Sequence, residues 1–143
     1  MDLNKADDRY ELVNELLRHL GSVDDAIQMK AVMDYIVDQE LLWVIRERLI
    51  SLSILMNTGN NFGYVLFIEL EEMKTSDEDS KWTFPLEKVF NGFIKGAILP
   101  CIDSLIEVSR SWNLDDYRAR DFQSKLGQKM EMLRNWYKER YDL

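Results

Sequence analysis

Apolar residues spaced three and four apart run through most of the chain, and this spacing constrains the fold more than any other feature. Such spacing places side chains on one face of an α-helix. The longest series comprises Met29, Val32, Met33, Ile36, Val37, Leu41, Leu42, Ile45, Leu49 and Leu52. Only 2 Pro and 6 Gly occur in 143 residues, so little interrupts such helices. The sequence therefore predicts an all-α protein: a single-domain helical bundle of four to five helices spanning residues 1–143.

Capping residues predict where the first helices begin and end. The first helix is expected at about residues 5–20, with an apolar face of Val13, Leu16, Leu17 and Leu20. Gly21 is its expected C-terminal cap, and Ser22 is the expected N-cap of the next helix. Residues 23–56 form either one very long helix or two helices. A break near Asp38 is favoured, because helices much longer than about 25 residues are unusual in a small domain.

Two further helices are predicted in the C-terminal half. One begins near Pro85, which suits a first-turn position, and Pro100 should kink or end it. The last helix is capped by Asn113 or Asp115. Its apolar face consists of Phe122, Leu126, Met130, Leu133 and Tyr137.

Residues 57–80, NTGNNFGYVLFIELEEMKTSDEDS, join a predicted Gly- and Asn-rich loop to an apolar centre and an acidic end. Within them, residues 64–71 fit either a strand with alternating faces or a central, buried helix. A lone strand would leave its backbone groups unpaired, and no other segment has a convincing strand pattern. We therefore interpret residues 64–71 as helical, in a helix that begins near Phe62 with Asn60 or Asn61 as its cap. The alternative is a lone strand that pairs with a second copy or a foreign chain.

Residues that commonly carry catalysis are few. His19 is the only histidine and Cys101 the only cysteine, so neither a zinc site nor a His-dependent triad has support. His19 is expected near the end of the first helix, where an imidazolium meets the helix dipole favourably. Cys101 has apolar neighbours and is expected to be a buried small side chain. We therefore expect no catalytic residue, no cofactor and no metal.

Paired carboxylates provide the one enzymatic alternative. Glu69 and Glu72 lie three residues apart and Asp34 and Asp38 four apart, so each pair shares a helical face on which Mg²⁺ could bind. The pairs resemble the acidic clusters of helical nucleotide pyrophosphohydrolases, which implies Mg-dependent nucleotide hydrolysis. However, Glu71 is not followed by the residues that would complete a Glu-Glu-x-x-Glu motif. Solvated helix faces explain these carboxylates better.

Charge is distributed unevenly along the chain. The net charge is −8, and by residue count it is −6 over residues 1–40, −3 over 41–90 and +1 over 91–143. An anionic surface disfavours free nucleic acid and membrane phosphates as partners, and it attracts a basic protein surface. The N-terminus lacks the apolar core of a signal peptide, so we expect a cytoplasmic protein.

Acidic residues near a tryptophan define the predicted partner-binding site. Carboxylates beside an aromatic anchor suit docking into a basic groove. The alternative is a solvated loop, and helix-dipole stabilisation alone explains the last two carboxylates of the set. The predicted site residues are Glu69, Glu71, Glu72, Asp77, Glu78, Asp79, Trp82, Asp115 and Asp116.

In size, acidity and helical character the chain resembles small acidic helical immunity proteins, which neutralise bacterial toxins in the producing cell. The resemblance covers no diagnostic motif, so it transfers no residues. It implies an inhibitor that occludes a basic site, such as a nuclease active site, on a partner protein. The alternatives are a regulatory or assembly homodimer, paired through apolar helix faces around residues 41–70, and the Mg-dependent hydrolase.

Overall fold

Four helical rods account for nearly all of the chain that the computed structural model describes. The described residues are 2–27, 32–75, 83–111 and 117–143, and side chains are described at 2–25, 39–61, 88–111 and 119–143. The rods are α1 (Ala6–Ile27), α2 (Val32–Thr75), a continuous rod of α3 (Thr83–Phe93), the π-helical turn η2 (Ile94–Ile98) and α4 (Leu99–Ser111), and α5 (Tyr117–Tyr141). The prediction of an all-α helical bundle is confirmed.

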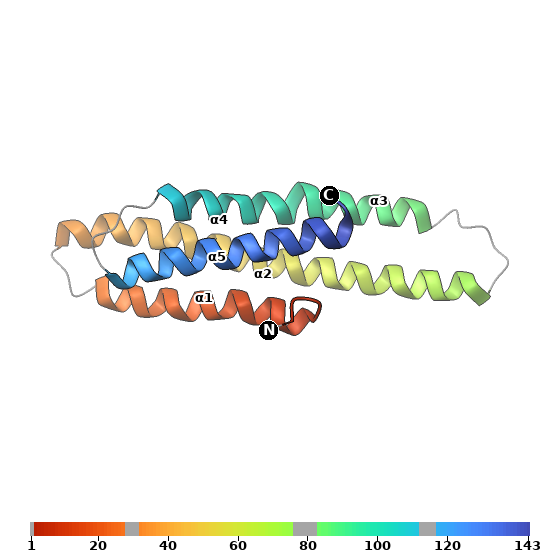
Figure 1. The fold of residues 1–143 in the computed structure, drawn as a ribbon, viewed down its shortest axis with the longest axis horizontal. Helices are drawn as coiled ribbons and strands as arrows, with labels where there is room; N and C mark the ends of the chain where they lie inside the picture. Colours follow the sequence, from red (N-terminus) through yellow and green to blue (C-terminus); the bar gives the residue numbers. More distant parts are fainter. Residues whose placement is uncertain (1, 28–31, 76–82, 112–116) are drawn as a thin grey trace.

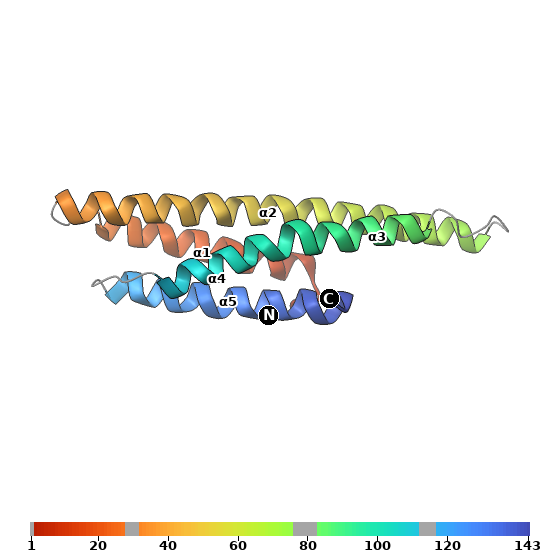
Figure 2. The same cartoon turned by 90° about the horizontal axis from the view of Figure 1, so that it is seen from above.

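The rods pack side by side, with α2 diagonally opposite α5. α1 contacts both α2 and α5, and α4 contacts the same two helices. In Figure 2, α2 and α5 accordingly lie along opposite edges of the bundle. α2 has 44 residues and is about 66 Å long at 1.5 Å per residue. Its C-terminal part and α3 extend beyond the ends of α1 and α5 as a two-helix arm (Figure 1).

The core is built from the faces that the apolar spacing predicts. Val13, Leu16 and Leu20 of α1 are buried. The other predicted core residues that are buried are Leu42, Ile45, Leu49 and Leu52 of α2, and Phe122, Leu126, Met130, Leu133 and Tyr137 of α5. Each fully buried large apolar side chain contributes about 1.5–3 kcal/mol. The hydrophobic spacing therefore identified which faces meet in the described part of the bundle.

α1 does not end at Gly21. The helix continues to Ile27, and Val23, beyond the predicted cap, is buried. No glycine among the described residues has a positive φ, so Gly21 lacks the left-handed conformation of a C-terminal cap. The prediction of a cap at Gly21, and of an N-cap at Ser22, is therefore wrong. The buried Val23 extends the apolar face of α1 past Leu20, and its burial favours a continued helix over the cap that Gly21 and Ser22 indicate locally.

α2 is continuous through both of its predicted interruptions. Its backbone is helical at Asp38, where a break was favoured, and through residues 57–63, where a loop with an Asn cap was predicted. Both predictions are wrong; the segment between α1 and α2, residues 28–31, lies outside the described residues. Residues 64–71 are helical, so that interpretation is confirmed and the strand alternative is wrong.

The third rod passes Pro100 without ending. Proline has no N–H, and its ring clashes with the carbonyl four residues before it in an ideal α-helix. Here the N–H of Leu99 bonds to the carbonyl of Ile94, five residues back, which widens the turn just before Pro100. The prediction that Pro100 ends the helix is therefore wrong; a π-helical turn stands just before Pro100, and the helix continues to Ser111.

One helical stretch of the described residues, Lys88–Ser111, meets the length and composition of a membrane span: it has 24 residues, and an 18-residue window within it has a mean hydropathy of 1.4. The same test is passed by the core helix of a bundle. Ile94, Ile98, Ile102 and Leu105 of this stretch are buried in the core. Packing against the other helices therefore accounts for these four residues, although only 39% of the apolar window is buried.

We expect Gly21→Ala to raise the free energy of unfolding by about 1 kcal/mol, measured by urea denaturation followed by circular dichroism. Alanine is favoured over glycine inside a helix, and a Cβ added at Gly21 meets nothing within 4 Å. A destabilisation of similar size would instead indicate a left-handed cap at Gly21 and would contradict its place inside α1.

Candidate functional site

Three large apolar side chains are exposed in a row on the outer face of α2. Trp43, Ile50 and Ile54 are 58%, 44% and 61% exposed. Their spacing of seven and four residues places them in a strip about 40° wide and about 16 Å long. The strip lies opposite the buried face of α2, and no other described helix runs along that edge in Figure 2. We call Trp43, Ile50 and Ile54 the α2 stripe.

Two carboxylates flank the α2 stripe on one side. Glu40 and Glu47 are exposed, and neither forms an ion pair with another described residue. On the other side, Nη2 of Arg46 lies 3.5 Å from Oδ2 of Asp24 in α1, so this charge is balanced within the bundle. Arg48 lies about 140° around the helix from Trp43 and away from the stripe. The uncompensated charge beside the stripe is therefore negative.

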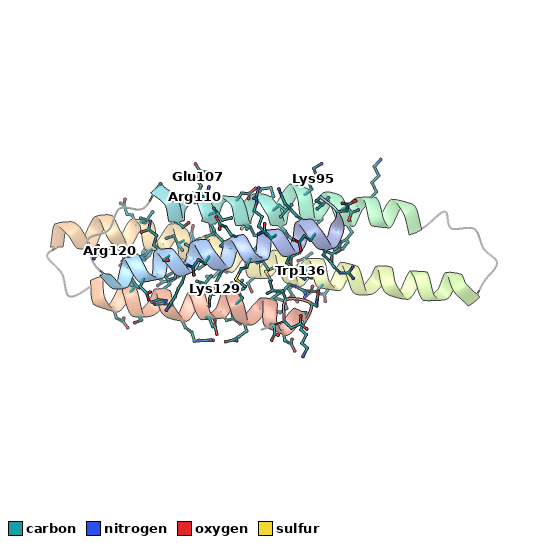
Figure 3. The ribbon with its side chains drawn as sticks, viewed as in Figure 1. Lys95, Glu107, Arg110, Arg120, Lys129 and Trp136 are labelled. Atoms are coloured by element: carbon teal, nitrogen blue, oxygen red, sulfur yellow. The ribbon has the colours of Figure 1, made fainter. Side chains whose placement is uncertain are left out.

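A buried polar cluster joins three helices one to two turns beyond Ile54. Arg9 is only 7% exposed; it donates from Nη1 to the carbonyl of Leu3 at 2.7 Å and from Nη2 to Oδ1 of Asn60 at 3.0 Å. Its guanidinium lies 4.3 Å from the ring centroid of Trp136, which Figure 3 shows near the N-terminal end of α1. We call Arg9, Asn60 and Trp136 the Arg9 cluster; it fixes α1, α2 and α5 to one another.

Tyrosines around the Arg9 cluster stay protonated at neutral pH. Oη of Tyr10 donates to Oδ1 of Asn57 at 2.9 Å, and burial raises the pKa of Tyr10. Burial raises the pKa of Tyr137 to about 12. Both phenols are therefore neutral at pH 7. Tyr10 acts as a hydrogen-bond donor to the amide of Asn57, and Tyr137 packs in the core. The polar residues of the predicted loop thus serve to join α2 to α1.

His19 lies on the face between α1 and α5. Its Nε2 is 3.7 Å from Oδ2 of Asp121, and its ring packs edge-on against Phe122 at a centroid distance of 5.4 Å. Because α1 extends to Ile27, His19 lies two turns before its end, and the predicted helix-end position is wrong. Burial, followed by the nearby Lys125, lowers the pKa of His19 below 6.5, and Asp121 only partly offsets this.

We expect the free energy of unfolding to fall as pH drops from 6.5 through the lowered pKa of His19. In that range the unfolded chain binds a proton that the folded protein does not, so acidification favours unfolding. The measurement is the urea midpoint at pH 7.0 and pH 5.5 for wild type and His19→Gln. The urea midpoint of the variant should fall less between pH 7.0 and pH 5.5 than that of wild type. An identical fall in both proteins would contradict a contribution from His19.

Two further places in the described part combine polar groups with a groove or a half-buried thiol. Between α4 and α5, a groove contains the ion pairs Arg110–Glu131 at 2.8 Å and Arg134–Asp103 at 2.7 Å. Cys101 is half-buried, not fully buried as predicted; its Sγ lies 3.5 Å from the carbonyl of Arg48, and burial raises its pKa. Among the described residues, no group of three or more His, Cys, Asp or Glu is placed to hold a metal.

The predicted partner-binding residues fall where side chains are not described. Glu69, Glu71 and Glu72 lie on the last turns of α2, and only their backbone is described. The remaining residues of the site lie outside the described ranges: Asp77, Glu78, Asp79, Trp82, Asp115 and Asp116. The acidic site therefore stays a prediction, as does the magnesium alternative, since the side chains of Asp34 and Asp38 are also not described.

The α2 stripe is not among the predicted site residues. Its sequence signal is a second series at positions 43, 47, 50 and 54, which interleaves with the core series of the same helix. Only the homodimer alternative placed contact faces in this region, around residues 41–70. Burial separates the two series, because Leu42 and Leu49 are buried while Trp43 and Ile50 are exposed.

The described structure defines an all-α helical bundle whose longest helix presents an apolar stripe beside unpaired carboxylates. Comparison of the chain with protein families, curated proteins and solved structures found no match. The resemblance to immunity proteins therefore stays a prediction.

Proposed function

We propose that this chain is a protein-binding module of the inhibitor or immunity type, which occludes a basic site on a partner protein. The observation that supports the proposal is the α2 stripe beside Glu40 and Glu47. Aromatic and large apolar side chains that are exposed in a group are typical of surfaces buried on association. Unpaired carboxylates next to them favour a partner with basic residues, and the net charge of −8 steers such a partner towards the chain.

Binding also suits the described residues better than catalysis does. The buried Tyr137 stays protonated, and the ring of His19 packs against Phe122 between two helices. The magnesium alternative has a direct test, which is calorimetry with millimolar Mg²⁺ or Mn²⁺. Saturable heat with either metal would support the hydrolase, and the absence of heat would count against it.

The inhibitor proposal is tested with the protein encoded by the neighbouring gene, which for an immunity-type protein is the toxin. We expect a complex with a Kd of about 1 nM or lower, and loss of the partner's nuclease activity in the complex. Failure of the two purified proteins to associate would contradict the immunity assignment.

The predicted acidic site is tested within the same complex by charge reversal at Asp77, Glu78 and Asp79. Weaker binding of the reversed variant would support a contact there. Unchanged affinity would remove these residues from the interface and leave the α2 stripe as the remaining candidate.

A homodimer is the second candidate, because the same exposed stripe could pair with its own copy. A symmetric pair centred on the stripe brings the two Glu47 side chains close to each other, and like charges repel across such a contact. Light scattering separates the two cases: a monomer at high protein concentration excludes the homodimer, and a dimer that Ile54→Asp dissociates supports it.

A further inference from the structure

We infer that the α2 stripe binds a single basic amphipathic helix of the partner protein, aligned along α2. This inference rests on the proposed function and specifies which element of the partner is bound. The stripe is about 40° wide, which matches the single seam along which one helix packs on another. Its length of about 16 Å corresponds to three helical turns.

The spacing of the α2 stripe is that of a helix–helix contact. Positions 43, 50 and 54 are separated by seven and four residues, as core positions of a coiled coil are. All three are apolar and exposed, so no described helix covers them. An amphipathic helix with its own apolar seam would bury Trp43, Ile50 and Ile54 together.

Charge identifies the partner helix as basic. Glu40 and Glu47 are seven residues apart, so they lie on the same side of the stripe and about 10 Å from each other. Lysine or arginine residues spaced seven apart along one side of a partner helix would reach both carboxylates. Arg46, on the opposite side, is occupied by Asp24. The same carboxylates repel anionic lipid and nucleic acid, so a basic protein helix is the occupant that fits.

Exposed apolar residues elsewhere in the described part do not form such a series. Val89 on α3 and Met132 on α5 are 59% and 51% exposed. Among the side chains described on their helices, residues 88–93 of α3 and 119–141 of α5, each is the single exposed large apolar one, as scattered surface residues commonly are. Val89 therefore provides a matched control, because it is as exposed as Ile54 but has no exposed large apolar neighbour among the side chains described on α3.

The test uses two synthetic helical peptides of 18 residues that share a leucine seam. One peptide has lysine at the positions flanking the seam, and the other has glutamate there. Binding of each fluorescently labelled peptide to the full chain is measured by anisotropy at about 50 mM salt, where exposed charges are weakly screened. We expect the lysine peptide to bind at least about tenfold more tightly, and Ile54→Asp but not Val89→Asp to weaken it about tenfold or more.

A charge-swap variant separates local recognition from net charge. Glu40→Lys with Glu47→Lys changes the net charge from −8 to −4, since each substitution adds two positive charges. The control, Glu107→Lys with Glu139→Lys, reverses two exposed carboxylates on α4 and α5 and gives the same net charge. We expect the first variant to reverse the preference between the peptides and the control to retain it.

Three results would overturn the inference. The first is that both variants bind the glutamate peptide more tightly than the lysine peptide. The second is that both variants still bind the lysine peptide more tightly. The third is that neither peptide binds the full chain at 1 mM. In the second case, a loss of binding in Ile54→Asp would still leave the stripe as a docking surface, so the proposed function would stand without the basic helix. Failure of the neighbouring gene's product to bind would instead remove the proposed function, whatever the peptides do.

Discussion

Arg9→Ala should lower the free energy of unfolding by about 2–4 kcal/mol, one of the two largest losses we expect from a single substitution here. Alanine removes the hydrogen bonds to the carbonyl of Leu3 and to Oδ1 of Asn60, and it removes the cation–π contact with Trp136. The buried stem of the side chain is also lost. The loss is limited, because Arg9 forms no ion pair with a described carboxylate and its buried charge is itself costly.

Arg140→Ala is the matched control for Arg9→Ala. The guanidinium of Arg140 also lies over a ring, 6.0 Å from the centroid of Tyr141, but this side chain is exposed. Urea denaturation of both variants should show a loss of less than about 0.5 kcal/mol for Arg140→Ala. Equal losses in the two variants, or no loss in Arg9→Ala, would show that the Arg9 cluster does not hold α1, α2 and α5 together.

Gly59→Leu should destabilise the protein by about 1–3 kcal/mol through overpacking. Gly59 is buried where α2 passes the third rod, and a Cβ added there lies 3.4 Å from Cδ1 of Ile98 and 3.6 Å from Cε1 of Phe93. These are ordinary contact distances for one carbon. A leucine side chain would have to displace both neighbours.

Gly59→Ala should therefore have the opposite effect. The single methyl group fits, and alanine is favoured over glycine inside a helix by up to about 1 kcal/mol. Thermal unfolding of the two variants provides the comparison, with alanine raising the midpoint and leucine lowering it. Similar midpoints for leucine and alanine would indicate a solvent-exposed position and would contradict the helical packing of residues 57–63.

Apolar spacing predicted the helices and their buried faces because it is a property of the local sequence. The series Phe122, Leu126, Met130, Leu133 and Tyr137 needs only its own helix to be recognised, and all five residues are buried. The helix at residues 64–71 followed from the absence of a partner strand. The all-α fold class could be predicted for the same reason, because each helix is recognised from its own residues.

Boundaries of the helices were predicted less well because distant contacts decide them. Asn57 and Asn60 have the composition of a loop, yet they bond to Tyr10 and Arg9, about fifty residues earlier in the chain. Gly59 lies against Ile98 and Phe93 of the third rod. Nothing within residues 57–63 indicates these partners, so a loop was the reasonable local interpretation.

The candidate interface was missed for a related reason. The spacing of apolar residues assigned one series to the core, namely Leu41, Leu42, Ile45 and Leu49. Trp43, Ile50 and Ile54 have a similar helical spacing on the opposite face of the same helix. Which of two apolar faces is covered depends on where the other helices pack. α2 lies diagonally opposite α5 and contacts α1 and α4 on its inner side, so the face with Trp43 and Ile54 is left uncovered.

The central claim is that the α2 stripe is the surface through which this chain binds its partner. The most direct test is the affinity of the neighbouring gene's product for wild type, Ile54→Asp and Val89→Asp, measured by calorimetry. Ile54 and Val89 are 61% and 59% exposed, so an aspartate at either position should leave the fold intact. We predict that Ile54→Asp weakens binding about 30-fold, equivalent to about 2 kcal/mol, and that Val89→Asp weakens it less than about twofold. Equal affinities for wild type and Ile54→Asp would contradict the claim.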